Sequence, residues 1–414
     1  MTDGWERRQQ ALARPRHVSW RWLRWPPTVA YALLLTSGAF KTDERLLPIP
    51  FDLTMGAAAV TLGYVLWRLF VVRNPLPKQA LWLIVMFAAF AIPEFTAGPA
   101  TDYGAAKVTN LFTLTFLAAI APFFIIRNRR DAKDFFMVLG GLSVIISLDM
   151  VLQVLAGDSG RVTGFAGNPI WSGRMAGLGL LMAATAIMTR VVPNATGAIL
   201  AVIASVALIG SGTRGALIGA IGGLVVAYPL SRASRPGARH RVALPVVVVL
   251  AFVASIAFSQ ERNLDRFADL TSGDFGNSQQ FRAEAYSVTL TEISNTQSGI
   301  GWGRYGELRY GVGSDGAYPH NLILEVAVEG GWIPAAIMVF IIGDVFAIAI
   351  REGPKRPESV FAAALLAFTF VAAMFSGDIN GNRLFFAMLG VVLALSRLET
   401  ITGRPEPQPL PEEE

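Results

Sequence analysis

Cysteine is absent from the 414-residue sequence, and charged residues make up only 16% of it. Without cysteine, the chain has no disulfides, no cysteine-ligated zinc and no thiol catalysis. A soluble domain usually carries about 25% charged residues, so the scarcity of charge points to a lipid environment. This composition argues against a soluble enzyme and against a protein that binds nucleic acid.

The sequence contains long apolar blocks. Hydrophobic residues make up 53% of the sequence, and the mean hydropathy is +0.47. A helix needs about 20 apolar residues to cross a bilayer, and it satisfies its backbone hydrogen bonds within the segment. We therefore predict an all-α polytopic membrane protein with about 12 transmembrane helices. The predicted spans are 27–42, 50–72, 80–97, 107–126, 134–156, 172–190, 195–210, 213–230, 242–259, 321–350, 358–376 and 382–397.

Basic residues are distributed unevenly between the two sides that these spans define. The side of the termini holds 22 arginines and lysines, whereas the short loops of the other side hold seven. Cytoplasmic loops carry the excess of such residues, so we predict that both termini are cytoplasmic. The net charge of +5 has the same origin. A cleaved signal peptide is the alternative for the basic N-terminus, but no clean small-x-small site follows it.

The spans divide the chain into five regions. Residues 1–26 form a basic cytoplasmic N-terminus, and 27–259 carry helices one to nine. Residues 260–320 form one large extracytoplasmic loop between helices nine and ten, 321–397 carry helices ten to twelve, and 398–414 form a disordered cytoplasmic tail.

The loop 260–320 is far longer than the other outer loops, and long loops in compact folds are usually functional or disordered. Its aromatic residues argue for order, and the pattern of 279–293 predicts a helix. Guanidinium groups hold phosphate oxygens through paired donors. We therefore predict a phosphate-binding role for the loop; solvated or salt-bridged arginines are the alternative. Its arginines are Arg262, Arg266, Arg282, Arg304 and Arg309.

His320 lies directly before the tenth span and is one of three histidines. An imidazole titrates near neutral pH and can accept a proton from an attacking hydroxyl. The alternative is an interfacial histidine that caps the next helix, and Asn321 is equally suited to capping. We place Tyr318 and Asn321 beside His320 as candidate substrate-binding residues. His17 and His240 lie in basic cytoplasmic stretches and look like surface residues.

Two glycine-rich turns face the same outer side. The turn 210–216 reads GSGTRGA, and its Arg214 lies at or just above membrane depth, where an unpaired cation is costly. A snorkelling interfacial anchor is the alternative. The second turn, 164–169, lies between Arg161 and Arg174.

Three motifs in this order resemble the O-antigen ligase and O-antigen/exopolysaccharide polymerase superfamily of bacterial envelope enzymes. They are SGTRGA at 211–216, Arg282 in the long outer loop, and HNLIL at 320–324 followed by EGG at 329–331. The resemblance covers 160–400 in motifs and the whole chain in topology. Thr213 departs from the serine that the family more often carries, but it keeps the hydroxyl.

The resemblance implies a metal-independent glycosyltransferase in the bacterial inner membrane, without a cofactor and with its active site on the periplasmic side. The implied donor is a glycan on undecaprenyl diphosphate, and the acceptor is lipid A–core or another glycan. Arg214 and Arg282 would grip the diphosphate, and His320 would position or deprotonate the acceptor. Arg161, Arg174, Arg266 and Arg304 would bind substrate with Tyr318 and Asn321. Membrane lipid is a further partner.

Ligase and polymerase differ only in the acceptor, and the sequence leaves both open with a slight preference for the ligase. A transporter is the alternative from a different class. It would place polar groups mid-membrane and show paired repeats with broken helices, and no duplicated halves are evident in the sequence.

Overall fold

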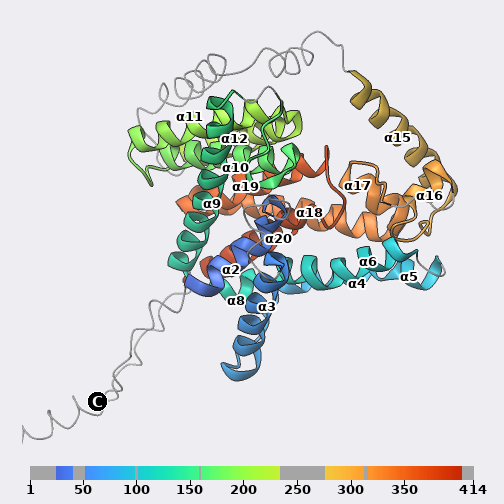
Figure 1. The fold of residues 1–414 in the computed structure, drawn as a ribbon. Coiled ribbons are helices and arrows are strands. Elements are labelled where there is room, and N and C mark those ends of the chain that lie inside the picture. The colour runs from blue at the N-terminus through green and yellow to red at the C-terminus, as the bar shows by residue number, and fades with distance from the viewer. Residues whose placement is uncertain are drawn as a thin grey trace, which may run out of the picture.

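The computed structural model describes residues 25–40, 52–97, 101–157, 160–233, 276–311 and 316–402. Within these ranges the chain is helical and contains no strand. Figure 1 shows the helices arranged as a bundle, with α3 projecting away from the others. The N-terminal residues 1–24, the predicted ninth span and most of the predicted tail lie outside the described residues.

The first half of the chain forms short and long helices in alternation. These helices are α2 (Trp25–Thr36), α3 (Leu53–Leu66), α4 (Ala80–Phe90), α5 (Ile92–Thr96), α6 (Asp102–Asn110), α7 (Phe116–Ile120), α8 (Pro122–Ile125) and α9 (Arg129–Leu155). Two π-helical stretches, η4 (Trp67–Val71) and η5 (Leu111–Thr115), continue α3 and α6.

The second half contains the helices that carry most of the candidate site residues. They are α10 (Pro169–Met188), α11 (Asn194–Ser211), α12 (Arg214–Ala233), α15 (Gly276–Asn295), α16 (Tyr305–Tyr310), α17 (Leu322–Glu325), α18 (Trp332–Glu352), α19 (Pro357–Ala373) and α20 (Arg383–Thr402). The π-helix η7 (Val326–Gly330) joins α17 to α18.

These helices agree with the apolar pattern of the sequence. Eleven of the twelve predicted spans coincide with a helix or a run of consecutive helices, and the remaining one, 242–259, is not described. Among the described residues, seven helices are long and apolar enough to cross a membrane, and two shorter apolar ones, Ala80–Thr96 and Pro357–Ala373, accompany them. The protein is therefore a multi-pass membrane protein. The count of twelve and the sidedness of the loops stay predictions.

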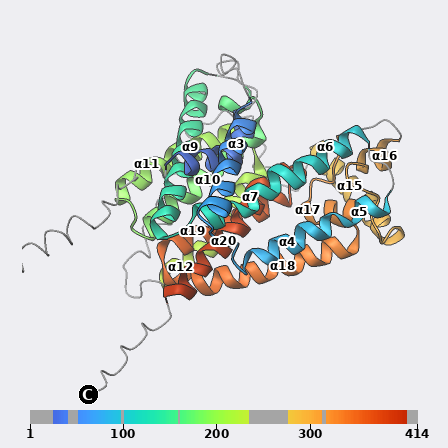
Figure 2. The ribbon, with the colours of Figure 1, turned by 90° about the horizontal axis from the view of Figure 1, so that it is seen from below.

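Small residues allow the central helices to pack closely, as is common between membrane helices. Helix α10 packs against α9, α11 and α12, and α12 packs against α19. A Cβ atom on Gly177 would lie 3.0 Å from the Ala216 carbonyl oxygen, and one on Gly223 would lie 2.9 Å from that of Ala364. Figure 2 shows α4 and α18 running side by side from this bundle towards α15 and α17.

Candidate functional site

The turn that carries Arg214 is held by a second arginine from the preceding loop. Helix α11 ends at Ser211, the following Gly212 adopts a left-handed conformation with φ of 61°, and α12 begins at Arg214. The Arg161 Nε atom donates to the Ser211 carbonyl oxygen at 2.7 Å, and its Nη2 atom lies 3.2 Å from Thr213 Oγ1. The structure therefore brings Arg161 to the turn of Arg214.

Helix α10 supports the same turn from the other side. The Thr213 hydroxyl donates to the Pro169 carbonyl oxygen at 2.8 Å. A Cβ atom on Gly173 would lie 2.6 Å from Ser211 Oγ and from Thr213 Oγ1, so only glycine fits at this point of α10. The arginine turn is thus fixed by main-chain and hydroxyl contacts on both flanks.

Gly173→Ala should push the arginine turn away from α10 and lower the free energy of unfolding by about 1–3 kcal/mol, the usual cost of overpacking. Thermal unfolding in detergent measures this loss. The matched control is Gly141→Ala in α9, where an added Cβ meets nothing within 4 Å. The control should be neutral or slightly stabilising, since alanine is the better helix former. Equal stability of the two variants would contradict the close contact.

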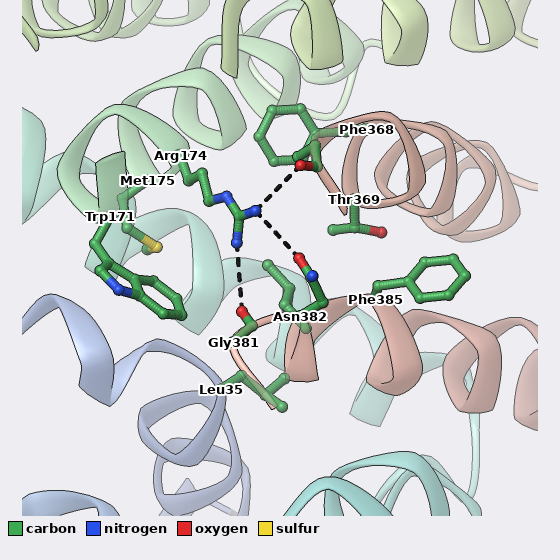
Figure 3. A pocket seen from close by; sticks show the side chains of 11 residues that line it. Leu35, Trp171, Arg174, Met175, Phe368, Thr369, Gly381, Asn382 and Phe385 are labelled. Atoms are coloured by element: carbon green, nitrogen blue, oxygen red, sulfur yellow. Dashed lines mark hydrogen bonds between the residues drawn. The ribbon is translucent and has the colours of Figure 1, made fainter. Parts of the chain in front are cut away.

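Arg174 lies apart from the arginine turn and ties α10 to the connection between α19 and α20. Figure 3 shows its guanidinium directed at Gly381 and Asn382. It donates to the Gly381 carbonyl at 3.3 Å, and to the Ala372 carbonyl and Asn382 Oδ1 at 3.1 Å each. The Ser376 carbonyl is a further acceptor. A cavity of ≈ 30 Å³ beside it is large enough for about one water molecule. All of the hydrogen-bond acceptors named for Arg174 are atoms of the protein.

His320 lies at the centre of a second group of side chains, which residues of the long loop form. Its ring lies 4.5 Å from that of Tyr318 and 6.2 Å from that of Phe281, measured between centroids. Its φ of 59° places a non-glycine residue in the left-handed region, where such strain often accompanies function. Its Nδ1 atom is buried and has no hydrogen-bond partner among the described residues.

Burial, reinforced by the charges of Arg282 and Arg309, lowers the pKa of His320 to about 4. The imidazole is therefore neutral near pH 7 and able to accept a hydrogen bond or a proton. Arg309 lies 3.9 Å from the Phe281 ring centroid and donates to the Phe281 carbonyl oxygen at 3.1 Å. Arg282 lies within electrostatic range of His320.

Asn321 caps helix α17. The sequence analysis considered both His320 and Asn321 for this role. Its Oδ1 atom accepts from the backbone N–H groups of Ile323 and Leu324 at 3.1 Å each, and its side chain hydrogen-bonds Tyr286. A cap of this kind stabilises the first turn of a helix. Because Asn321 provides it, the His320 side chain is left to face Tyr318 and Phe281.

The other loop arginines have different surroundings. Arg309 lies 3.7 Å from the Glu284 carboxylate, which is the salt-bridged alternative that the sequence left open. Arg304 is half-buried at the start of α16, next to Gly301. Arg262 and Arg266 lie outside the described residues. The predicted helix of 279–293 is part of α15.

A buried charge cluster, Lys107 with Glu325 and Glu329, escaped the sequence analysis. Lys107 Nζ lies 2.6 Å from Glu325 Oε1 and also pairs with Glu329, and all three side chains are almost fully enclosed. The Ile379 backbone N–H donates to Glu325 at 3.1 Å. The sequence analysis counted Lys107 among the seven basic residues of the short outer loops and named Glu329 only as part of the EGG motif. The available signal was an ionisable residue inside an apolar run, which marks a functional site by default.

Tyr318 packs against His320 and lies within electrostatic range of Glu325. Burial raises the pKa of Tyr318, and the charges of Asp378 and Glu325 raise it further. Its hydroxyl is therefore protonated at neutral pH.

The loop is fastened to the membrane helices by its main chain. The Ile300 and Gly301 N–H groups donate to the Val328 and Glu329 carbonyls at 2.9 Å each. Gly299 and Gly331 both adopt positive φ, and a Cβ atom on Gly299 would lie 2.6 Å from the Gly331 nitrogen. Two backbones can approach this closely only at glycine, which explains the GG pair in the motif at 329–331.

Comparison with protein families matches residues 199–341 to the family described as O-antigen ligase. This segment, about a third of the chain, is similar to the O-antigen ligase family. Arg214, Arg282 and His320 lie inside the matched segment, whereas Arg161, Arg174 and Lys107 precede it. The match confirms the family resemblance that the motifs predicted.

The match to the O-antigen ligase family supports a glycosyltransferase-like enzyme that uses, in general terms, a lipid-linked glycan and a glycan acceptor. Comparison with curated proteins and with solved structures gives no match. In the part of the chain that the structure describes, no three metal-ligating side chains gather into a site.

Proposed function

We propose that the protein is a ligase that transfers a glycan from undecaprenyl diphosphate to a sugar hydroxyl of lipid A–core. The reaction would take place at the periplasmic face of the inner membrane, without a metal or cofactor. The observation that carries the proposal is the neutral, partly buried His320 beside Arg282, within the segment that matches the O-antigen ligase family. A base next to a fixed cation suits the attack of a hydroxyl on a sugar whose leaving group is a diphosphate.

In the proposed reaction, the acceptor hydroxyl oxygen attacks the anomeric carbon of the donor. The bond between this carbon and the diphosphate oxygen breaks at the same time. His320 accepts the hydroxyl proton and later passes it to solvent. Arg214 and Arg282 hold the diphosphate, whose negative charge grows as it leaves, and fixed cations aimed at such charge lower the barrier. A single displacement of this kind inverts the anomeric centre.

Donor binding would also change the pKa of His320. Arg282 and Arg309 lower the pKa of His320 because their positive charges disfavour an imidazolium. A diphosphate bound at Arg282 offsets this charge, so the pKa of His320 rises towards its ordinary value. The imidazole thus becomes a stronger base when the donor is in place, which matches the pKa to the working pH.

The proposed role of His320 predicts a specific pH dependence. Because its pKa is about 4 in the free enzyme, the neutral form persists as pH falls from 7.5 to 5.5. Over that range, kcat/KM should not decline through protonation of His320. Arg309→Gln removes one of the two cations, so the acid limb should move to higher pH. Arg351→Gln, at the far end of α18, is the control and should leave the limb unchanged. An acid limb near pH 6.5 in the wild type would contradict the burial of the imidazole.

Arg214→Lys tests the diphosphate clamp. A lysine keeps the charge but cannot reproduce the paired donors of a guanidinium, so transfer should fall by about 100-fold, as for the loss of one key donor to a developing charge. Arg232→Lys, at the other end of α12, is the matched control and should retain activity. If lysine serves as well as arginine at position 214, the residue is only an interfacial anchor.

The deciding experiment incubates purified protein with undecaprenyl-diphosphate-linked glycan and a chelator, without nucleotide, in the presence or absence of lipid A–core. The products are then separated by size. A single transfer that requires lipid A–core supports the ligase. A growing ladder from the donor alone makes the protein a polymerase, and donor left unconsumed with every acceptor favours a transporter.

A further inference from the structure

Helices α15 and α16 lie together at the edge of the molecule (Figure 1) and expose two aromatic rings. Phe281 of α15 is 42% exposed, and Tyr310, the last residue of α16, is 52% exposed. Arg309 joins the two rings: its guanidinium carbon lies 3.9 Å from the Phe281 ring centroid and 5.1 Å from that of Tyr310. Both distances are within the range of a cation–π contact. The three side chains form one surface patch, which we call the aromatic platform.

The aromatic platform adjoins the His320 group. The Phe281 and His320 ring centroids are 6.2 Å apart and the two rings are inclined at 65°, which is an edge-to-face arrangement. On its other side, His320 packs against Tyr318. A molecule that rests on the aromatic platform therefore lies next to the proposed base.

The positive charge of the aromatic platform is already offset within the protein. Arg309 Nη2 donates to the Phe281 carbonyl oxygen at 3.1 Å and lies 3.7 Å from the Glu284 carboxylate, and the Arg309 side chain is only 8% exposed. The platform therefore suits an uncharged partner better than a diphosphate. The Glu284 side chain is 74% exposed, so its carboxylate is able to accept hydrogen bonds from hydroxyl groups of a ligand.

An exposed aromatic surface with a hydrogen-bond acceptor at its edge matches the chemistry of a sugar ring. One face of a pyranose consists of C–H bonds that pack on an aromatic ring, and its rim carries hydroxyl groups that donate to a carboxylate. Lipid tails match less well, because the charged residues Arg282 and Glu284 follow Phe281 closely in α15. There is also room beside Tyr310: a Cβ atom on Gly311 would meet nothing within 4 Å.

We propose that Phe281 and Tyr310, together with the carboxylate of Glu284, bind a sugar ring of the acceptor glycan. This inference rests on the proposed function, in which His320 accepts the proton of the acceptor hydroxyl. The acceptor is the occupant because the platform adjoins His320 and its cation is offset, whereas the donor is held through its diphosphate. The bound ring is a neighbour of the sugar that carries the reacting hydroxyl, so the platform selects among acceptors.

The test measures equilibrium binding of lipid-free core oligosaccharide to the purified full-length protein in detergent, by titration in saturation-transfer NMR. Tyr310→Ala should raise the dissociation constant about five- to tenfold, the effect of losing one aromatic contact. Tyr310→Phe keeps the ring and should bind like the wild type. The matched control is Leu290→Ala: Leu290 is 57% exposed on α15 but lies about 13 Å along the helix from Phe281, so its loss should leave binding unchanged.

Thermal unfolding of each variant verifies the fold. No binding by the wild type would overturn the proposal, as would equal binding by the wild type and Tyr310→Ala or an equal loss in Leu290→Ala. Stronger binding of the glycan released from the donor would overturn the assignment to the acceptor.

The transfer assay with lipid A–core separates this result from the test of the proposed function. Transfer by the wild type, with core binding that does not depend on Tyr310, refutes only the aromatic platform. Binding that depends on Tyr310, without transfer to any acceptor, refutes only the proposed reaction.

Discussion

Replacing His320 with alanine is expected to lower glycan transfer by about 100- to 10,000-fold, the range that a general base contributes. The imidazole faces Tyr318 and Phe281 from a loop next to Arg282, and burial holds it neutral. Its loss removes the group that accepts the hydroxyl proton and orients the acceptor, while Asn321 still caps α17. The measurement is the initial rate of transfer with purified protein, donor and acceptor.

The left-handed backbone at position 320 calls for a second variant. Alanine is strained at a φ of 59°, whereas glycine adopts it freely. His320→Gly therefore removes the imidazole and relieves the backbone, so a stable but inactive glycine variant assigns the loss to the side chain. His17→Ala, in the basic N-terminal stretch, is the control. Normal transfer by either position-320 variant would remove the proposed role of the base.

Lys107→Met is expected to destabilise the protein by about 3–5 kcal/mol, the cost of breaking a buried ion pair by removing one partner. Glu325 and Glu329 would then face each other in an enclosed space without a cation. The free energy of unfolding in a denaturing-detergent titration measures the loss. A triple variant that adds Glu325→Gln and Glu329→Gln should recover much of it, because a neutral cluster leaves no uncompensated charge.

Lys355→Met is the matched control for the buried lysine. Lys355 pairs with Glu352 at 2.6 Å, but its side chain is 48% exposed at the end of α18. Ion pairs in contact with solvent contribute about 0–1 kcal/mol, so this variant should unfold almost like the wild type. If Lys107→Met proves as stable as Lys355→Met, the buried cluster does not hold the helices together.

The helices were predictable because an apolar run long enough to cross a membrane has few other conformations available. The helix-compatible spacing of apolar and aromatic residues over 279–293 located most of α15. Arg282 and His320 could be grouped because both belong to one predicted loop. The resemblance to the family followed from three motifs in a fixed order.

The contacts of Arg174 could not be predicted, because its acceptors are mostly main-chain carbonyls, which every sequence has. The same holds for Arg161, which donates to the Ser211 carbonyl. Lys107 and Glu329 are separated by more than 200 residues, and hydrophobic periodicity does not say which helix faces meet. Tertiary packing alone decides such pairs.

The backbone seam between residues 297–301 and 328–332 has a consequence for how such an enzyme changes over time. The seam consists of main-chain hydrogen bonds and glycine contacts, so side chains on the exposed faces of α15 and α16 contribute little to it. Substitutions on those faces can accumulate without loosening the loop from the membrane helices. Selection for a different sugar can therefore act on the outer surface while the anchoring scaffold stays the same.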